Sequence, residues 1–401
     1  MKIGLDAYVF RFPITGIGNY TYQLSRNLIS KYNNDFFNLF VEDLNFSLKE
    51  MHDLPQNASY VEVKRGYLTG MRLFDGVMRK LLRNYYHTGK ANTLYFNLFP
   101  LLKNRLEYLT QDLDIWHAID WYFYPSKKAK ANIITMFDLT TLRFPQFHDD
   151  LCLQKEKIKK QELKKYDGII AISESTKNDL VEYYDISPEK IETIYLGVDE
   201  CYESDNYIRK DEISARIGIP KNARYILSVS TIEPRKNFIQ VLKIFKKYQE
   251  KNPKDDLFLI CTGMWGWKND ELNQFLQTFP DKSKVIFTGY LETEILPSLY
   301  FHSEVFVYLS LFEGFGLPIL EAMKSRTPVI CSNTSSMPEV LGDSGILVSP
   351  DSTDECVNAL EMIVQNPNLA NDFRKKAYER SSQFTWEKSA EQTYQFYKKF
   401  L

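Results

Sequence analysis

Residues 305–323, VFVYLSLFEGFGLPILEAM, carry the pattern that decides the fold. The apolar run Val305–Ser310 predicts a buried strand, and Gly314 and Gly316 predict a turn whose backbone can approach a ligand closely. A helix is expected to begin near Pro318, because proline suits the first helical position. Together these features predict one strand–turn–helix unit of an α/β sheet, with a helix N-terminus that can bind an anion such as phosphate.

Two carboxylates lie on either side of this turn. Glu313 precedes it, and Glu321 falls about one turn into the expected helix, roughly 5 Å along at ~1.5 Å per residue. Carboxylates so placed can bracket a nucleotide sugar, one binding hydroxyls of the sugar and the other hydroxyls of the ribose. The alternative interpretation is a strand–turn–helix corner in which one glutamate only caps the helix.

The same alternation of apolar strands and helical stretches extends through the rest of the chain. Helical patterns occur, for example, at Asn19–Lys31, Asn237–Lys251 and Thr353–Gln365. The expected strands are Lys2–Ala7, Phe36–Val41, Tyr60–Lys64, Asp114–Ile119, Asn132–Phe137, Gly168–Ser173, Ala223–Ser230, Leu257–Thr262, Lys284–Thr288, Val305–Ser310, Pro328–Ser332 and Gly345–Val348. Two such series predict two doubly wound parallel sheets, with ligands at the carboxyl ends of the strands.

The length of 401 residues also favours two domains, because a single core seldom grows so large. Residues 197–220 are polar and lack strand periodicity, so we place the domain boundary there. The first domain then covers residues 1–200 and the second covers 201–385. The final amphipathic helix, about 386–401, has no strand after it and is expected to pack back on the first domain.

A second cluster, TIEPRKN at 231–237, directly follows the strand that ends at Ser230. Arg235 and Lys236 bring two positive charges to the carboxyl end of that strand. A nucleoside diphosphate that leaves a sugar gains negative charge, which such a pair can stabilise. Solvated charge at a helix start is the alternative interpretation, but positive charge there opposes the helix dipole.

The composition excludes several classes of protein. A formal net charge of −2 provides no overall attraction for nucleic acid, so any anion site must be local. Five widely spaced cysteines without a CxxC pair indicate a reducing compartment and argue against a disulfide framework or structural zinc. We expect a cytoplasmic protein, since the N-terminus does not resemble a signal peptide and no apolar run is long enough to span a membrane.

The ensemble of motifs closely resembles retaining glycosyltransferase family 4, in particular its bacterial mannosyltransferase-like members. The matching segments are GIGNY (16–20), DIWH (114–117), AISEST (171–176), LGVD (196–199), EPRKN (233–237), FTGY (287–290), the pair Glu313 and Glu321, and NTSSMPEV (333–340). This resemblance implies the GT-B fold, in which two Rossmann-like domains face each other across a cleft. It also implies an enzyme that needs no metal, because a lysine and a helix terminus do the electrostatic work of the metal.

The resemblance assigns roles to individual residues. Lys236, with Arg235, is expected to hold the donor diphosphate, Glu321 to bind the ribose, and Glu313 to lie by the hydroxyls of the donor sugar. Backbone atoms at Phe315, Gly316 and Leu317 are expected to meet sugar and phosphate. The remaining assignments are Gly289 and Tyr290 beside the base, His117 near the reaction centre, and Gly16 and Gly18 in an N-terminal loop that reaches toward the diphosphate.

Two departures from the family pattern matter. Phe137-Asp138 stands where many relatives have a His-Asp pair, which puts the role of a second active-site histidine in doubt. That role would then fall to His117 or Asp138. Ser230-Thr231 stands where many relatives have an arginine. From the residues alone, a lone histidine such as His117 is more often a structural residue, and the resemblance is what favours a functional one. Asp112 and Asp114 spell a metal-binding DxD triplet, but they lead into a core strand, so we discount it.

The expected reaction moves a hexosyl unit, with retention, from a nucleotide-diphosphate sugar to a hydroxyl of a glycan or glycolipid in surface polysaccharide synthesis. The favoured donor is GDP-mannose, and UDP- or dTDP-sugars remain open. A catalytically silent nucleotide-sugar-binding protein, or an epimerase or phosphorylase of the same fold, is also compatible with the pattern, because a fold does not fix a function. The basic segment 64–105 is either a patch that contacts the inner face of the membrane or a solvated helix face.

Overall fold

The structure, a computed structural model, describes residues 1–7, 10, 16–41, 54–62, 108–120, 125–148, 150–204, 206–266, 269–279 and 281–401. The basic segment 64–105 lies outside these residues. The chain divides into two compact units. Unit 1 holds Met1–Ile172, Lys177–Ile194 and Trp386–Leu401, and unit 2 holds Ser173–Thr176 and Tyr195–Thr385. The main segment of unit 2 thus begins at Tyr195, a few residues before the boundary at 200 that the sequence predicts, and the chain returns to unit 1 at Trp386.

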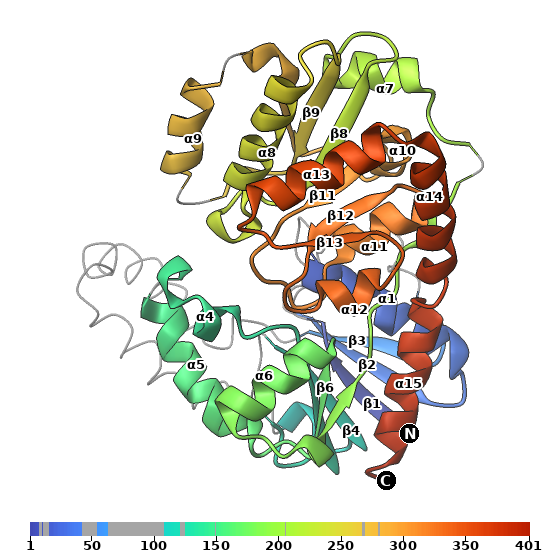
Figure 1. The fold of residues 1–401 in the computed structure, drawn as a ribbon. Coiled ribbons are helices and arrows are strands. Elements are labelled where there is room, and N and C mark those ends of the chain that lie inside the picture. Colours follow the sequence, from blue (N-terminus) through green and yellow to red (C-terminus); the bar gives the residue numbers. More distant parts are fainter. Residues whose placement is uncertain are drawn as a thin grey trace, which may run out of the picture. The chain divides into compact units, whose positions relative to one another are not determined.

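Unit 1 is built on a parallel sheet of order β3-β2-β1-β4-β5-β6-β7 (Figure 1). Its strands are β1 Lys2–Asp6, β2 Phe36–Val41, β3 Ala58–Glu62, β4 Ile115–Ile119, β5 Ala131–Met136, β6 Gly168–Ala171 and β7 Ile191–Thr193. Its described helices are α1 Gly16–Lys31, α4 Thr140–Arg143, α5 Asp150–Leu163, α6 Glu174–Tyr184, whose first residues group with unit 2, and α15 Trp386–Lys398. Strands β4 and β5 are buried throughout, which explains why most of their residues are apolar.

The C-terminal helix α15 packs against α1 within unit 1 (Figure 1). The rings of Tyr32 and Tyr394 stack with centroids 3.5 Å apart, and Tyr20 lies 6.0 Å from Trp386. Asp35 joins the two ends of the chain, because its carboxylate contacts both the N-terminal amine and the Tyr394 hydroxyl. The final helix is therefore an integral part of unit 1.

Unit 2 is a second parallel sheet, of order β10-β9-β8-β11-β12-β13. Its strands are β8 Arg224–Val229, β9 Leu257–Thr262, β10 Val285–Gly289, β11 Val305–Tyr308, β12 Val329–Ser332 and β13 Ile346–Val348. Its helices are α7 Lys210–Ile217, α8 Phe238–Lys251, α9 Asp270–Gln277, α10 Leu296–His302, α11 Leu317–Lys324, α12 Met337–Leu341, α13 Thr353–Val364 and α14 Pro367–Ser381. Helices α8 and α13 contribute to one apolar core together with β8, β9 and β11.

The strand order of each unit matches the doubly wound pattern predicted from the sequence. In unit 2 the chain adds β9 and β10 on one side of β8 and then returns to place β11 on the other side. Ligands of such sheets bind at the carboxyl ends of the two strands that flank this reversal. The two charged motifs of unit 2 follow β8 and β11, so both fall at this point.

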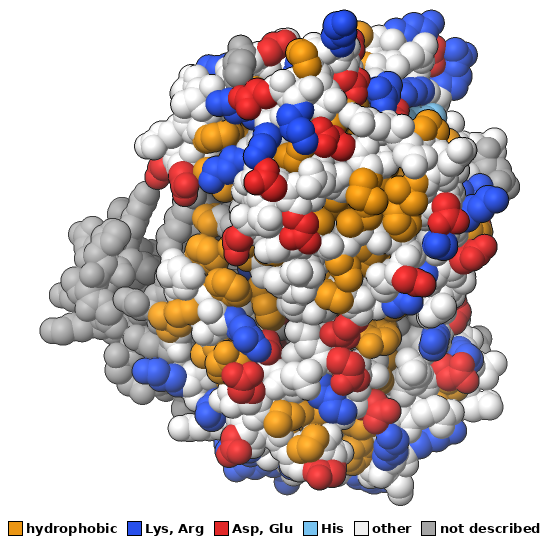
Figure 2. All heavy atoms as spheres, in the orientation of Figure 1, with side chains coloured by type: hydrophobic (Ala, Val, Ile, Leu, Met, Phe, Trp, Pro, Cys, Tyr) orange, Lys and Arg blue, Asp and Glu red, His pale blue; other side chains and the backbone are white. Residues whose placement is uncertain are grey.

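The described surface mixes charges of both signs. On the face drawn in Figure 2, Lys and Arg side chains alternate with Asp and Glu side chains, without a wide field of one sign. Among the described residues, no helix is both long and apolar enough to cross a membrane.

Candidate active site

The loops after β8 and β11 are tied together by backbone contacts. The Arg235 carbonyl accepts hydrogen bonds from the Leu311 amide at 2.8 Å and from the Ser310 hydroxyl at 3.2 Å. The short turn Pro234–Lys236 ends at Asn237, whose backbone is left-handed with φ 56°, and α8 begins directly after it. This sharp reversal fixes the position of Arg235 and Lys236 beside the Gly-rich turn.

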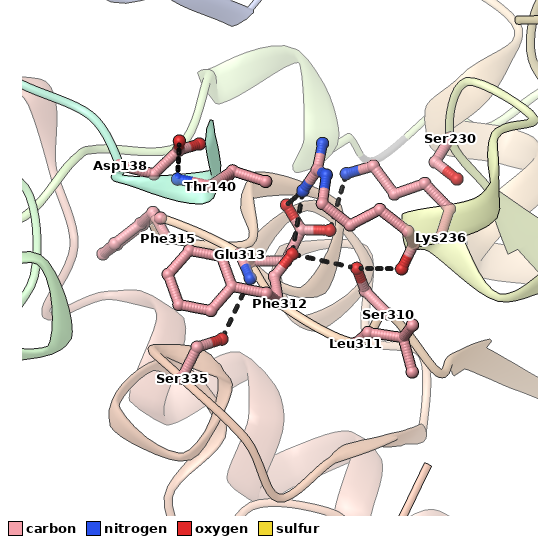
Figure 3. Close-up of polar contacts among 12 residues, drawn as sticks. Asp138, Thr140, Ser230, Lys236, Ser310, Leu311, Phe312, Glu313, Phe315 and Ser335 are labelled. Carbon is pink, nitrogen blue, oxygen red and sulfur yellow. Dashed lines mark hydrogen bonds and ion pairs between the residues drawn. The ribbon is translucent and has the colours of Figure 1, made fainter. Parts of the chain in front are cut away.

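Glu313 is the centre of a buried polar cluster (Figure 3). One of its carboxylate oxygens lies 2.6 Å from Lys236 Nζ and accepts a 2.8 Å hydrogen bond from the Tyr308 hydroxyl. The other oxygen lies 3.0 Å from a guanidinium nitrogen of Arg235, whose second terminal nitrogen contacts Glu233 at 2.9 Å. The side chains of Glu313 and Lys236 are only 9% and 12% exposed, so both charges depend on these partners.

The backbone around Glu313 is held from the loop after β12. The Ser335 hydroxyl accepts from the Glu313 amide at 2.9 Å, and the Ser336 hydroxyl donates to the carbonyls of Glu313 and Phe315, each at 2.9 Å. Gly316 then adopts φ 100° as the N-cap of α11, a conformation that side-chain-bearing residues rarely adopt. The start of α11 is thereby set beside the Lys236–Glu313 pair.

The carboxyl of Glu313 is ionised at neutral pH. Burial alone would raise the pKa of Glu313, but the charges of Lys236 and Arg235 outweigh it and lower that pKa to about 2. Burial lowers the pKa of Lys236 below its ordinary value, and the Glu313 carboxylate opposes that shift. An ammonium group has three donors, and Lys236 directs two of them at Tyr308 and Glu313, so one stays available to a ligand oxygen.

Glu321 lies in α11 in a different environment. The Tyr300 hydroxyl donates to its carboxylate at 3.0 Å, and Tyr202 also hydrogen-bonds to it. Burial raises the pKa of Glu321 to about 7, and these hydrogen bonds only partly oppose the shift. The two glutamates of the motif therefore differ at neutral pH, since Glu313 is fully charged and Glu321 is near its midpoint.

Gly289 and Tyr290 lie at the end of β10, at the same carboxyl edge of the unit 2 sheet. Gly289 has φ 70°, and a side chain there would meet nothing within 4 Å. Gly16 and Gly18 are the first residues of α1 in unit 1, whereas the sequence places them in a loop before that helix. Phe315 is buried, while Leu317 begins α11 and is only partly buried.

His117 is fully buried in β4 of unit 1. Its Nδ1 lies 2.5 Å from the Tyr397 hydroxyl of α15, and its Nε2 lies 2.8 Å from the Thr135 hydroxyl. Burial lowers its pKa to about 3, so the imidazole is neutral. With both ring nitrogens bonded to side chains of unit 1, His117 has the environment of a structural histidine, and its expected place near the reaction centre stays a prediction.

Replacing His117 with alanine should lower the free energy of unfolding of unit 1 by about 2–4 kcal/mol, because it opens a cavity and leaves two buried hydroxyls with one partner fewer. Denaturant titrations at pH 7 and pH 5 test this. In the unfolded chain His117 binds a proton near pH 6.5, whereas in the folded chain it does so only near pH 3. The free energy of unfolding of wild type therefore decreases as the pH is lowered through this range. His117→Gln should show a weaker fall. Lost turnover with unchanged stability would instead indicate a direct catalytic role.

Other predicted positions have plain structural partners. Asp114 of the DxD triplet accepts from the Lys2 amide at 2.7 Å and pairs with Lys130 at 2.6 Å. Phe137 packs edge-on against Tyr20, with centroids 5.1 Å apart, and Asp138 accepts from the Thr140 amide at 2.9 Å. Among the described residues, no group of His, Cys, Asp and Glu is arranged to hold a metal ion.

Comparisons with known proteins agree with this architecture. Residues 14–200 match the family model described as Glycosyltransferase Family 4, and residues 209–380 match that of Glycosyl transferases group 1. The chain is a family 4 glycosyltransferase. O-antigen chain mannosyltransferase B of Escherichia coli is 27% identical over 406 residues, which cover 99% of the chain and 100% of that relative. O-antigen chain mannosyltransferase RfbU of Salmonella typhimurium is 28% identical over 243 residues, which cover 60% of the chain and 63% of the relative.

Solved structures show the fold of the glycosyltransferase. Sucrose-phosphate synthase of Thermosynechococcus elongatus superposes with a TM-score of 0.70 at 18% identity, covering 100% of the chain and 98% of that structure. An Escherichia coli structure titled as trehalose-6-phosphate with bound UDP-2-fluoro glucose gives 0.73 at 13% identity, covering 99% of both. The predicted GT-B fold is thus confirmed.

Proposed function

We propose that this glycosyltransferase moves a mannosyl unit from GDP-mannose to a hydroxyl of a growing cell-surface polysaccharide or lipid-linked glycan. The full-length similarity to O-antigen chain mannosyltransferase B supports the choice of sugar and acceptor class. The observation that carries the donor site is the Lys236–Glu313–Arg235 cluster at the β8/β11 reversal of unit 2. UDP- or dTDP-sugars are the alternative donors.

In this proposal the donor diphosphate binds at Lys236, Arg235 and the start of α11. As the bond between the anomeric carbon and the diphosphate breaks, negative charge grows on the leaving phosphate oxygen. The free N–H of Lys236 and the N-terminus of α11 stabilise that charge, and Glu313 keeps both cations oriented before the donor arrives. Glu321 accepts hydrogen bonds from the ribose hydroxyls.

We further propose that transfer retains the configuration of the anomeric carbon by a front-face route. The acceptor oxygen forms its bond to that carbon on the face from which the diphosphate leaves, and the departing phosphate oxygen takes the acceptor proton. Glu313, the carboxylate expected nearest the donor sugar, is held by two cations, which makes it a weak nucleophile. Residues Gly16 and Gly18, Gly289 and Tyr290, and backbone at Phe315–Leu317 complete the proposed donor contacts, and no metal takes part.

A donor screen tests the proposal. The purified chain is incubated with GDP-mannose, UDP-glucose and a dTDP-sugar without metal, and binding is followed by thermal shift and by hydrolysis of the donor. GDP-mannose should stabilise wild type most, and Lys236→Ala should abolish the shift. Stabilisation by a UDP-sugar instead would replace the donor in the proposal. Binding without turnover, even with oligomannose acceptors, would indicate a catalytically silent protein.

Donor affinity should depend on pH through Glu321. Below its pKa of about 7 the carboxyl is protonated and accepts fewer hydrogen bonds from ribose, so the Kd of GDP-mannose should rise up to about tenfold per pH unit as the pH falls. A nucleotide sugar is a suitable ligand because its diphosphate keeps the same charge across this range. Titration calorimetry from pH 5.5 to 8.5 measures the effect, and Glu321→Gln should bind weakly with no pH dependence.

The raised pKa of Glu321 also predicts that the folded state loses stability as the pH rises, whereas donor binding becomes stronger. The unfolded carboxyl ionises near pH 4.5, whereas the folded one holds its proton up to about pH 7. Stability is therefore lost as the pH rises from about 4.5 to about 7, and the full cost of Glu321 is present above that range. Glu321→Gln should therefore unfold at a higher temperature than wild type at pH 8 and not at pH 4. Equal melting temperatures at pH 8 would contradict the assigned pKa.

A further inference from the structure

An exposed apolar patch lies at the carboxyl edge of the unit 2 sheet, outside the charged cluster. Met264 and Trp265 follow β9, Tyr290 follows β10, and their side chains are 46%, 46% and 64% exposed. Eight large hydrophobic side chains are exposed among the described residues, and three of them gather here. Exposed apolar side chains that cluster at a binding edge indicate a ligand contact rather than chance exposure.

The loop that carries Trp265 is held closely against the segment that leads into Arg235 and Lys236. The Ile232 amide donates to the Met264 carbonyl at 2.8 Å, and the Ile232 carbonyl accepts from the Gly266 amide and the Asn269 side chain, each at 2.9 Å. Ile232 and Trp265 form a parallel bridge. Trp265 thus lies beside the chain only a few residues before the proposed diphosphate-binding turn.

Glycines on both sides of Met264 and Trp265 make this close packing possible. A Cβ on Gly263, where φ is 142°, would come within 1.9 Å of the Ser230 carbonyl oxygen. A Cβ on Gly266 would come within 2.9 Å of the Ile232 carbonyl oxygen. The loop is therefore fixed by its backbone, and the indole is presented from a rigid support.

The indole ring of Trp265 packs partly against Phe287, and the rest of the ring is exposed. Its centroid lies 5.1 Å from that of Phe287 in β10, with the planes tilted by 30°, while nearly half of the side chain stays exposed. Gly263 N donates to the Gly289 carbonyl at 3.0 Å, which joins the ends of β9 and β10. Since nothing lies within 4 Å of a Cβ on Gly289, the backbone beside the indole is open to a flat ligand.

We propose that Trp265 stacks on the nucleobase of the donor and makes the site prefer a purine to a pyrimidine. The inference rests on the proposed function, because the diphosphate at Lys236 brings the base to this edge. The cations at Arg235 and Lys236 bind any nucleoside diphosphate equally, so discrimination must come from contacts to the base. Stacking grows with the overlapped area, and a bicyclic indole covers a bicyclic purine more fully than a single pyrimidine ring.

Binding of GDP and UDP to three variants tests this. By titration calorimetry at pH 8, Trp265→Ala should raise the Kd of GDP about tenfold or more and that of UDP clearly less, so the ratio of the two Kd values narrows. Trp265→Phe should give Kd values between those of wild type and Trp265→Ala, because it keeps a ring but a smaller area for stacking. Met362→Ala, a 53%-exposed side chain on α13, is the matched control and should change neither Kd. GDP should also quench tryptophan fluorescence in wild type more than in Trp265→Phe.

The outcomes separate this inference from the proposed function. If both nucleotides bind in a Lys236-dependent manner and Trp265→Ala weakens them equally or by less than about twofold, the donor site stands and the role of Trp265 is overturned. If wild type binds neither nucleotide, the proposed function fails and the inference fails with it. Thermal unfolding of each variant shows whether unit 2 remains folded.

Discussion

Replacing Lys236 with alanine should lower kcat/KM for the donor about a thousand-fold, which corresponds to about 4 kcal/mol of transition-state stabilisation. The amine is buried and oriented by Glu313 and Tyr308, and in the proposed function its remaining donor stabilises the charge that develops on the leaving diphosphate. Initial-rate kinetics with GDP-mannose, or with the donor that the screen identifies, measure the effect. The loss should appear in both KM and kcat, because Lys236 contacts the bound diphosphate in the proposal and the charge on that diphosphate increases further in the transition state.

The control for this variant is Lys247→Ala in the same unit. Lys247 is 41% exposed and pairs with Asp354 on the surface, so its removal should change kcat/KM by less than about twofold. Lys236→Met keeps the aliphatic stem and serves as a second variant where alanine disturbs folding. A Lys236 variant that folds, binds donor and turns over within tenfold of wild type would refute the assigned role.

Replacing Glu313 with glutamine should lower kcat about a hundred-fold with a smaller effect on donor binding. Glutamine has nearly the same shape but leaves the two cations without their shared counter-charge. Burial and the nearby Arg235 then lower the pKa of Lys236 further, with only the charge of Glu233 left to oppose them. Because transfer needs Lys236 protonated, the loss of activity at high pH should set in at a lower pH than in wild type.

A rate profile from pH 6 to 10 measures this displacement. Glu313→Ala is a harsher variant, since it leaves the buried Lys236 without a carboxylate partner and Arg235 with Glu233 alone, and it should cost about 3–5 kcal/mol of stability. If the decrease in rate at high pH occurs at the same pH in Glu313→Gln as in wild type, Glu313 does not determine the pKa of Lys236. Its part in catalysis would then be limited to contacts with the donor sugar.

The fold could be predicted from local sequence patterns to a large extent. The largely apolar runs FFNLFV and LFLICT predict β2 and β9 with the bounds that the structure shows, because buried parallel strands are mostly apolar. Strand β3 was predicted two residues late, since its register depends on pairing of Phe37 with Ala58 in another strand. Strand β7, with three residues, is too short for any periodic pattern and was missed.

The sequence predicts the individual residues of the candidate site but not the hydrogen bonds and ion pairs that join them. Lys236 and Glu313 are 77 positions apart, and only the adjacency of β8 and β11 explains why they form an ion pair. Tyr308 carries no local signal, because a tyrosine in a strand is common, and Ser335 belongs to the NTSSMPEV motif, which by itself does not show that its hydroxyl accepts from the Glu313 amide. The buried state of His117 depends on Tyr397, a partner 280 positions later that no local window contains.

The return of the chain to unit 1 has a consequence for biosynthesis. Unit 2 is complete once Thr385 has left the ribosome, but unit 1 still lacks Trp386–Leu401 at that moment. Until the last residues emerge, α1 has no α15 beside it and the imidazole of His117 has no Tyr397. Unit 1, whose first residues are translated before unit 2, can therefore complete its fold only after unit 2. A premature stop codon just before Trp386 would release a chain in which unit 2 is folded and unit 1 is incomplete, so that chaperones and proteases can bind unit 1.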